Sequence, residues 1–331
     1  MFFQGRGEGG AEKSTTWIAN RFIEMGWRVQ YISNNERPSG TFRKEGSDKV
    51  NFTNDLDEIS KPCDLLVLYT NDYIWEFGKE LIVNKFSNLQ ALRKVMCINF
   101  RLGKIGILPW TQDWDQYLFL NSSLEETFRS TYMKSKGDSF YAFKTKSMPP
   151  PTDLTEYYTR SPDYSGKLRL IRHSSQGDTK YPKNFNDMLD NIIEEIPNIE
   201  IHLMPAPSFL DYPRFQGKVI PHRKNDPPIP EYLSTFGNVF WYKLPDGYED
   251  QGPKVIMESM GIGLPVIADN HSGAKDRVIK GTGILCNSFQ EHIQAMKYFV
   301  SEHAREMFGK AAKEHAKREF IPENWITEIL G

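Results

Sequence analysis

The chain has 331 residues, 39% of them hydrophobic, with 41 Lys and Arg against 43 Asp and Glu. This length predicts two domains, each large enough to bury a core, and the net charge of −2 disfavours a nucleic-acid-binding protein. No apolar run is long enough to span a bilayer, the opening MFFQGRGEGG lacks the core of a signal peptide, and the three cysteines are too widely spaced for a disulfide framework or a cysteine-built zinc site. We therefore expect a cytoplasmic protein.

The first half predicts alternating strands and helices. After the short strand MFF and a glycine-rich loop, we expect a helix over Ala11–Met25, which Gly26 ends, and then the strand RVQYIS. The apolar run DLLVLY is typical of a parallel strand covered on both faces. A helix over Ile74–Leu92 and the buried strand VMCINF follow. This alternation predicts a doubly wound sheet.

One stretch of this half is rich in basic residues. From Leu81 to Gln112 the sequence has five Lys or Arg and no acidic residue. Solvated helix faces explain such a stretch, and so does contact with phosphates or an anionic membrane surface. Both interpretations stay open.

A proline-rich segment, KTKSMPPPTD, separates the two halves and predicts a semi-rigid linker. The alternation then restarts with the strand LRLIR, a helix over Asn184–Ile196 and the strand IEIHLM. The strand NVFWY, a helix near Lys254 and the strand LPVIA follow, and helical sequence fills the chain from Phe289 to its end. The second half therefore predicts a second sheet of the same kind.

The stretch LPDGYEDQGPKVIMESMGIGLPVIADNHSG, Leu244 to Gly273, carries the clearest chemistry. A strand ends, the chain turns through Gly247 and Gly252, and Pro253 stands where the first helical residue is expected. The start of a helix at the carboxyl edge of a parallel sheet binds phosphates and sugar hydroxyls. Asp250 before this helix and Glu258 within it add two carboxylates, which accept strong hydrogen bonds from hydroxyls.

This stretch resembles the signature of retaining glycosyltransferases of the GT-B fold, of the family 4 or group 1 type. The usual pattern is Glu, seven residues, Glu, then Ala-Met-Ala-x-Gly-x-Pro-Val-Ile, and here it is Asp250, seven residues, Glu258 and SMGIGLPVIA. The resemblance covers essentially the whole chain. It implies an α/β protein with two Rossmann-like doubly wound domains facing a cleft and C-terminal helices that cross back.

The domains that this resemblance implies have definite boundaries. Residues 1–150 would form the acceptor-side domain and residues 151–310 the nucleotide-sugar domain. Residues 311–331 would be a helix that packs back on the first domain.

The resemblance also implies roles for the residues of the signature. Glu258 would bind the ribose of the nucleotide-sugar, and Asp250 would hold the transferred sugar. Asp250 is one methylene shorter than the usual Glu, and Pro253 has no amide to offer. The sugar would also be surrounded by Gly252, Pro253, Lys254 and Val255.

Two further motifs match the same family. GRGEGGAEKS resembles its Gly-Gly-Ala-Glu loop, so Gly9 and Gly10 would let the backbone approach the diphosphate. LIRHSSQGDTKYPKNF corresponds to its strand-end Arg and nearby Lys, so Arg172 and Lys180 would clamp the diphosphate, with Lys183 as a competitor for the second role. Arg172, Lys180 and Asp250 are thus the expected catalytic residues. His173 would contact the nucleotide, or serve as a buried structural histidine.

The expected activity is retaining, metal-independent transfer of a hexosyl group from a nucleotide-diphosphate sugar to a hydroxyl of a glycan, lipid-linked or small-molecule acceptor. No cofactor and no metal site is expected. The histidine that many family members carry in the first domain is absent, since all seven histidines lie between His173 and His315. Two alternatives therefore stay open: a non-catalytic sugar-nucleotide-binding or scaffold protein, and another GT-B enzyme such as an epimerase or phosphorylase. The oligomeric state is left open, and peripheral contact with the inner membrane face rests on the basic stretch alone.

Overall fold

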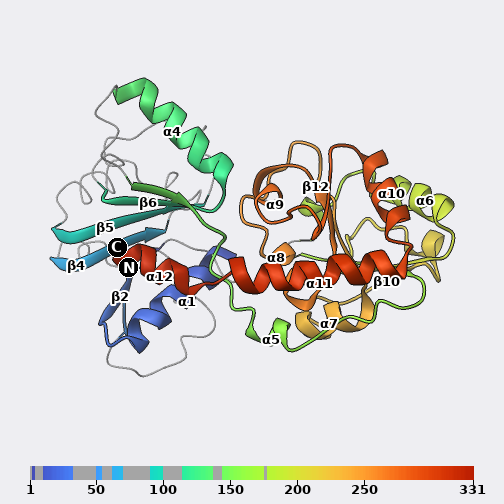
Figure 1. Cartoon of the computed structure of the whole chain (residues 1–331), viewed down its shortest axis with the longest axis horizontal. Coiled ribbons are helices and arrows are strands. Elements are labelled where there is room, and N and C mark those ends of the chain that lie inside the picture. Colours follow the sequence, from blue (N-terminus) through green and yellow to red (C-terminus); the bar gives the residue numbers. More distant parts are fainter. Residues whose placement is uncertain are drawn as a thin grey trace. The chain divides into compact units, whose positions relative to one another are not determined.

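The computed structural model of the chain describes residues 2–3, 10–32, 50–53, 62–69, 90–99, 114–136, 144–174 and 177–331. It divides into two compact units (Figure 1): unit 1 is Met1–Thr152 with Pro322–Gly331, and unit 2 is Asp153–Ile321. The predicted boundary at residue 150 lies beside the first division. The second division falls after Ile321 rather than after residue 310.

Unit 1 contains a parallel sheet of seven strands in the order β3-β2-β1-β4-β5-β6-β7. This is the order of a doubly wound sheet, in which the order of the strands reverses beside the first strand. The strands are β1 (Phe2–Phe3), β2 (Val29–Ile32), β3 (Val50–Thr53), β4 (Cys63–Tyr69), β5 (Ala91–Ile98), β6 (Gln116–Phe119) and β7 (Lys144–Ser147). The helices within the described residues of this unit are α1 (Gly10–Glu24), α4 (Ser122–Lys136) and α12 (Glu323–Leu330).

Two predictions in unit 1 need correction. The sequence KTKS, expected to begin the linker, forms the edge strand β7, where lysine is well tolerated because one side of the strand has no neighbour. The linker begins at Met148, just before the three prolines. The expected helix over 74–92 lies mostly outside the described residues, but Ala91 and Leu92 belong to β5. Pairing with β4 extends that strand beyond its apolar run.

The last helix, α12, belongs to the core of unit 1 and lies beside α1 (Figure 1). Trp325 is buried and donates from Nε1 to the carbonyl oxygen of Pro149, 2.7 Å away. Arg93 of β5 donates to the carbonyl oxygens of Ile329 and Glu328, at 2.7 and 3.1 Å. A guanidinium at the carboxyl end of a helix donates hydrogen bonds to the unpaired carbonyl oxygens of the helix and interacts favourably with the helix dipole. The C-terminal segment is therefore held to unit 1 by packing and by charge.

Unit 2 contains a parallel sheet of six strands in the order β10-β9-β8-β11-β12-β13. The strands are β8 (Leu168–His173), β9 (Ile199–Met204), β10 (Val219–Pro221), β11 (Val239–Tyr242), β12 (Val266–Asp269) and β13 (Gly283–Cys286). The helices are α5 (Thr155–Tyr158), α6 (Phe185–Glu195), α7 (Ile229–Phe236), α8 (Lys254–Ile262), α9 (Ser272–Lys275), α10 (Phe289–Tyr298) and α11 (Glu302–Glu319), with the short helices η5 (Asp178–Lys180) and η6 (Tyr212–Phe215).

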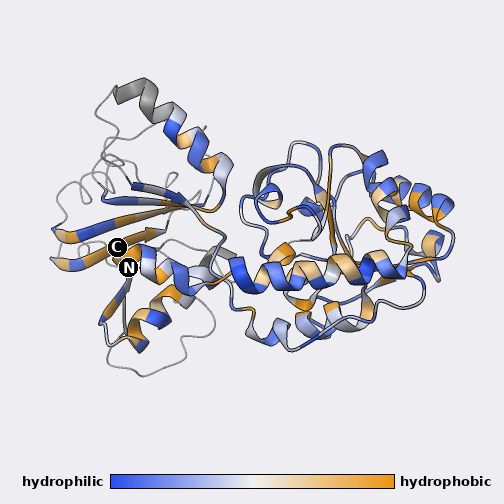
Figure 2. Ribbon diagram, viewed as in Figure 1, coloured by the Kyte–Doolittle hydropathy of each residue, from blue (hydrophilic) through white to orange (hydrophobic). Residues whose placement is uncertain are grey.

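Both faces of this sheet are covered, as its apolar strands predict. Alternate residues of β11 point to opposite faces: Val239 and Trp241 join the core under α6 and α10, and Phe240 and Tyr242 join the core under α7, α8 and α11. Hydrophobic residues accordingly follow the strands in Figure 2. The predicted α/β class with two doubly wound sheets is confirmed.

The crossing of α8 and α11 depends on a glycine. Any Cβ at Gly309 of α11 would overlap the carbonyl oxygen of Gly263 and the hydroxyl of Tyr164, which themselves form a 2.6 Å hydrogen bond. We expect Gly309→Ala to lower the free energy of unfolding by about 1–3 kcal/mol, the usual cost of overpacking. Urea denaturation measures this change. Lys310→Ala, at the next position of α11, is the matched control, because the Lys310 side chain is 71% exposed. Equal stabilities of the two variants would contradict this account of the crossing.

We expect a histidine pair at the β9–β10 edge to make unit 2 sensitive to acid. Nδ1 of His202 lies 2.9 Å from Nε2 of His222, and Nε2 of His202 lies 2.7 Å from the carboxylate of Glu200. Burial, and then the charge of His202, lowers the pKa of His222 to about 4. The unfolded chain therefore binds a proton at this residue between about pH 6.5 and 4 that the folded chain does not, so stability falls as the pH falls through this window.

We expect His222→Gln to weaken this pH dependence, because glutamine does not titrate and its amide still donates towards His202. The melting temperature of the variant, measured from pH 7 to 5, should decrease less steeply than that of the wild type. His303→Gln, at an exposed position on α11, is the control and should keep the wild-type slope. A wild-type slope in the His222 variant would show that this pair does not set the acid sensitivity.

Candidate functional site at the carboxyl edge of the unit 2 sheet

The candidate site lies where β8, β11 and β12 end. These strands are neighbours, and β8 and β11 flank the point where the strand order reverses. Ligands of doubly wound proteins bind outside the carboxyl ends of the strands at this point. The loops after these strands carry Lys180, Asp250 and His271, and α8 begins after the second of them.

Asp250 and Lys180 meet at this edge. The Asp250 Oδ2 atom lies 2.5 Å from Lys180 Nζ and accepts a 2.6 Å hydrogen bond from the hydroxyl of Tyr242, and Oδ1 accepts from the Gly252 N–H at 3.3 Å. The side chains of Asp250 and Lys180 are 15% and 12% exposed. Burial alone would raise the pKa of Asp250, but the Lys180 ammonium and these hydrogen bonds lower it. The site therefore holds an ionised carboxylate beside a cation.

The helix after this loop starts at Lys254, and Pro253 is its N-cap rather than its first helical residue. The difference is one position, and the proline still occupies a place where a missing N–H costs little. Gly263 ends the helix in the left-handed conformation, with φ of +103°. The first turn of α8, with Lys254 and Val255, lies directly after the loop of Asp250, as predicted.

Glu258 lies in the second turn of α8 with 15% of its side chain exposed. Its Oε2 atom is 3.1 Å from Nε2 of His173, an ion-pair distance without the alignment of a hydrogen bond. Tyr157 of α5 hydrogen-bonds the same carboxylate, and burial followed by the Glu258 charge raises the pKa of Tyr157. His173 itself is only 3% exposed and packs edge-on against Phe240. Glu258 is more exposed than His173 and is therefore the candidate for contact with a ligand.

Arg172, at the end of β8, is surrounded by main-chain acceptors. Its side chain is fully buried, with 0% exposure. Nη1 donates to the carbonyl oxygen of Lys243 at 2.6 Å and Nη2 to that of Lys180 at 2.5 Å, and the guanidinium lies over the ring of Tyr181 at 4.4 Å. Arg172 therefore joins the main chain of two loops at this edge, and its contact with a diphosphate stays a prediction.

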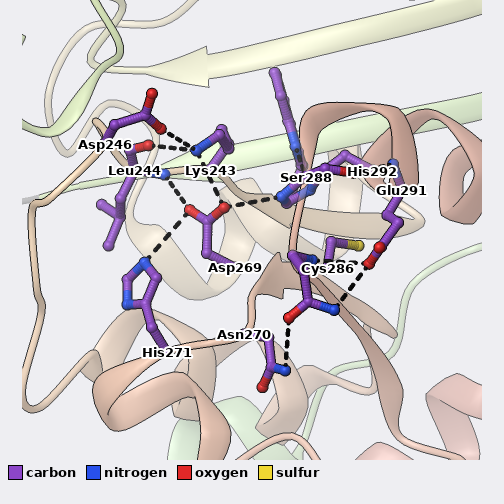
Figure 3. A network of polar contacts seen from close by, with 12 residues as sticks. Lys243, Leu244, Asp246, Asp269, Asn270, His271, Cys286, Ser288, Glu291 and His292 are labelled. Atoms are coloured by element: carbon purple, nitrogen blue, oxygen red, sulfur yellow. Dashed lines mark hydrogen bonds and ion pairs between the residues drawn. The ribbon is translucent and has the colours of Figure 1, made fainter.

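Asp269, at the end of β12, is the centre of a second polar network (Figure 3). One carboxylate oxygen accepts from the Leu244 N–H at 2.7 Å and lies 3.7 Å from Nε2 of His271. The other lies 3.1 Å from both Lys243 Nζ and His292 Nε2. Burial alone would raise the pKa of Asp269, but the nearby His271 and the hydrogen bonds from His292 and the Leu244 N–H lower it.

The tautomer of His292 follows from its neighbours. Trp241 donates from Nε1 to Nδ1 of His292 at 3.3 Å, and an indole N–H is only a donor. The proton of the imidazole therefore lies on Nε2 and is donated to Asp269. Asp269, His292 and Lys243 are not among the residues predicted from the sequence. The available signal was an acidic residue directly after the buried strand LPVIA, at the same sheet edge as the signature.

The glycines expected near the diphosphate lie in unit 1. Gly9 is outside the described residues, and Gly10 is the first residue of α1. Within the described part of the chain, no group of three or more His, Cys, Asp or Glu side chains is arranged to hold a metal ion. The same part has no helix long and apolar enough to cross a membrane.

The chain was compared with known proteins. No model of a protein family matches it, and no curated protein sequence matches it. Its fold is similar to that of HepE from Anabaena, solved with UDP, at a TM-score of 0.71 and 15% identity over 99% of this chain and 98% of that one. HepE has also been solved with UDP-glucose, at a TM-score of 0.68 and 13% identity over 99% and 97%.

Two other similar structures come from different organisms. One is the sucrose-phosphate synthase of Thermosynechococcus elongatus, with a TM-score of 0.68 and 15% identity over 97% of this chain and 93% of that one. The other is a glycosyltransferase from Rickettsia africae, with a TM-score of 0.68 and 12% identity over 99% and 98%. The structural neighbours are GT-B glycosyltransferases, and the predicted GT-B fold is confirmed.

Proposed function

We propose that the chain is a retaining, metal-independent hexosyltransferase that uses a nucleotide-diphosphate sugar. The observation that carries this proposal is the placement of Glu258, Asp250 and Lys180 at one sheet edge, around the start of α8. The edge combines carboxylates for hydroxyl groups with a cation and a helix N-terminus for phosphates. The similarity of the whole fold to HepE, which was solved with UDP-glucose, supports a ligand of this class.

Each group has a proposed role in donor binding. Glu258 accepts hydrogen bonds from the ribose hydroxyls, and Tyr157 and His173 hold its carboxylate in place. Lys180 contacts the diphosphate. Asp250 and the backbone from Gly252 to Val255 surround the sugar, so the Lys180–Asp250 ion pair lies where the sugar meets the phosphates.

The proposed transfer breaks the bond between the anomeric carbon and the diphosphate oxygen. A bond from the acceptor oxygen to the anomeric carbon forms on the same face of the sugar, and the proton of the acceptor passes to the leaving phosphate oxygen. The leaving group gains negative charge as the first bond breaks. The Lys180 ammonium and the positive end of the α8 dipole stabilise that charge, which lowers the barrier.

Turnover of UDP-glucose, with GDP-glucose and ADP-glucose in parallel, tests the proposal. We expect slow release of nucleoside diphosphate from one of the three without an acceptor, an unchanged rate in EDTA, and α-glucose as the first product seen by NMR. Inhibition by EDTA would overturn metal independence, and β-glucose would overturn retention. Binding without release of diphosphate or change of the sugar would favour the non-catalytic scaffold, and an epimerised sugar nucleotide would favour the epimerase.

We further propose that unit 1 binds the acceptor, a glycan or a lipid-linked or small-molecule hydroxyl, in the cytoplasm. The basic stretch Leu81–Gln112 is the candidate for contact with an anionic membrane, although only residues 90–99 of it lie within the described part. Sedimentation with anionic liposomes at low salt tests the contact. A chain that stays in the supernatant would remove the membrane from the proposal.

A further inference from the structure

Two oppositely charged side chains hold one peptide group at the start of the loop that carries Asp250. Arg172 donates to the carbonyl oxygen of Lys243 at 2.6 Å, and Asp269 accepts from the N–H of Leu244 at 2.7 Å. These two atoms belong to the same peptide unit. A peptide dipole is stabilised most by a cation at its oxygen and an anion at its N–H, so both contacts favour one orientation of this unit.

The two charged groups are themselves firmly placed. Arg172 is fully buried and lies over the rings of Tyr181 and Tyr242, at 4.4 and 5.2 Å. Asp269 is anchored on its other oxygen by His292, whose tautomer is fixed by Trp241. A peptide between such anchors has little freedom to move, because their rotamers are locked by packing and further hydrogen bonds.

The segment after β12 holds the same loop at a second point. The N–H of Gly273 donates to the carbonyl oxygen of Asp250 at 3.2 Å. A Cβ at Gly273 would lie 2.5 Å from the carbonyl oxygen of Gln251 and 2.6 Å from Cδ of Pro253, so only glycine permits this approach. The loop is thus fixed where it leaves β11 and again at Asp250.

We propose that Arg172 and Asp269 are positioning residues that act as a pair through the Lys243–Leu244 peptide to place the loop of Asp250 for catalysis. The catalytic consequence of this inference rests on the proposed function. The local rigidity that it assigns to the loop is independent of that function. It also gives Arg172 a role other than direct contact with the diphosphate.

Amide hydrogen exchange and kinetics on Arg172→Met, Asp269→Asn and the double variant test the pair. In both single variants we expect faster exchange confined to residues 244–252 and a 10- to 100-fold lower kcat with UDP-glucose at nearly unchanged KM, since a misplaced catalytic group lowers turnover by factors of this size. The kcat of the double variant should be no lower than that of the less active single variant, because either change alone releases the same peptide.

Arg305→Met is the matched control. Arg305 is also fully buried in unit 2 and donates to main-chain carbonyls, those of Tyr164, Gly166, Phe299 and Val300. It should lower stability without faster exchange at residues 244–252. Arg172→Lys and Asp269→Glu replace any variant that does not fold.

The outcomes separate the two proposals. Unchanged exchange at residues 244–252 in both single variants, or kinetic losses that multiply in the double variant, would overturn the pair. A wild-type chain that neither binds UDP, GDP or ADP nor turns over their sugars would overturn the proposed function, whereas the exchange experiment would still decide whether the pair holds the loop.

Discussion

Replacing Lys180 with alanine is expected to lower kcat for the nucleotide-sugar substrate by about 10²–10³-fold, the usual loss when one group that stabilises developing charge is removed. Lys180 is the cation beside Asp250, with its Nζ atom 2.5 Å from the carboxylate. The leaving diphosphate gains charge as the glycosidic bond breaks, so the loss should fall on kcat more than on KM. Steady-state release of nucleoside diphosphate measures both constants.

Lys183→Ala is the control for this experiment. Lys183 is exposed and lies three residues from Lys180, and its position in the sequence makes it the competing candidate. It should keep wild-type kinetics. The melting temperature of each variant must also be measured, because Lys180→Ala leaves the buried Asp250 carboxylate without its cation. Loss of turnover in the Lys183 variant alone would transfer the proposed role to that residue.

The second large effect is expected at Glu258. Replacement by alanine should weaken binding of the cognate nucleoside diphosphate by about 10- to 100-fold, which corresponds to the roughly 1.5–3 kcal/mol of a hydrogen bond to a charged group. The carboxylate is held by Tyr157 and approached by His173, so little reorganisation precedes ligand binding. Isothermal titration calorimetry measures the dissociation constants.

A deoxynucleotide tests whether Glu258 binds the ribose. If its carboxylate binds the ribose, the 2′-deoxy diphosphate should bind the wild type more weakly than the ribonucleotide, and the two should bind Glu258→Ala equally. Glu231→Ala, at an exposed position on α7, is the control and should discriminate as the wild type does. Full discrimination in the Glu258 variant would show that another group contacts the ribose.

Much of the architecture is predictable because hydrophobic patterns fix it locally. The segments DLLVLY, NVFWY and LPVIA contain continuous apolar runs, LRLIR alternates apolar and basic residues, and each contributes a strand of a parallel sheet. The strand β7 is not predictable in the same way. Its sequence KTKS carries no apolar pattern, and it becomes a strand only because β6 offers a free edge.

The candidate site is likewise predictable only where it depends on local sequence. The signature spacing places Asp250 and Glu258 at the start of α8, which is a local property of a loop and a helix. The environment of Arg172 depends on carbonyl oxygens of Lys180 and Lys243, the second 71 residues along the chain. The sequence shows an arginine at the end of a strand, but it does not show whether main-chain carbonyls or a ligand will receive its hydrogen bonds. The network of Asp269 escaped prediction for the same reason.

We propose above that the carboxyl edge of the unit 2 sheet binds a nucleotide-diphosphate sugar. The most direct test is the melting temperature of the wild-type chain and of Glu258→Ala with UDP, GDP and ADP, each without and with its glucose ester. A ligand at about a hundred times its dissociation constant stabilises a protein by roughly 2.7 kcal/mol, which raises the melting temperature measurably. We expect the ligands of one base to stabilise the wild type and the variant to lose most of this response. No response to any nucleotide, or an equal response in both proteins, would contradict it.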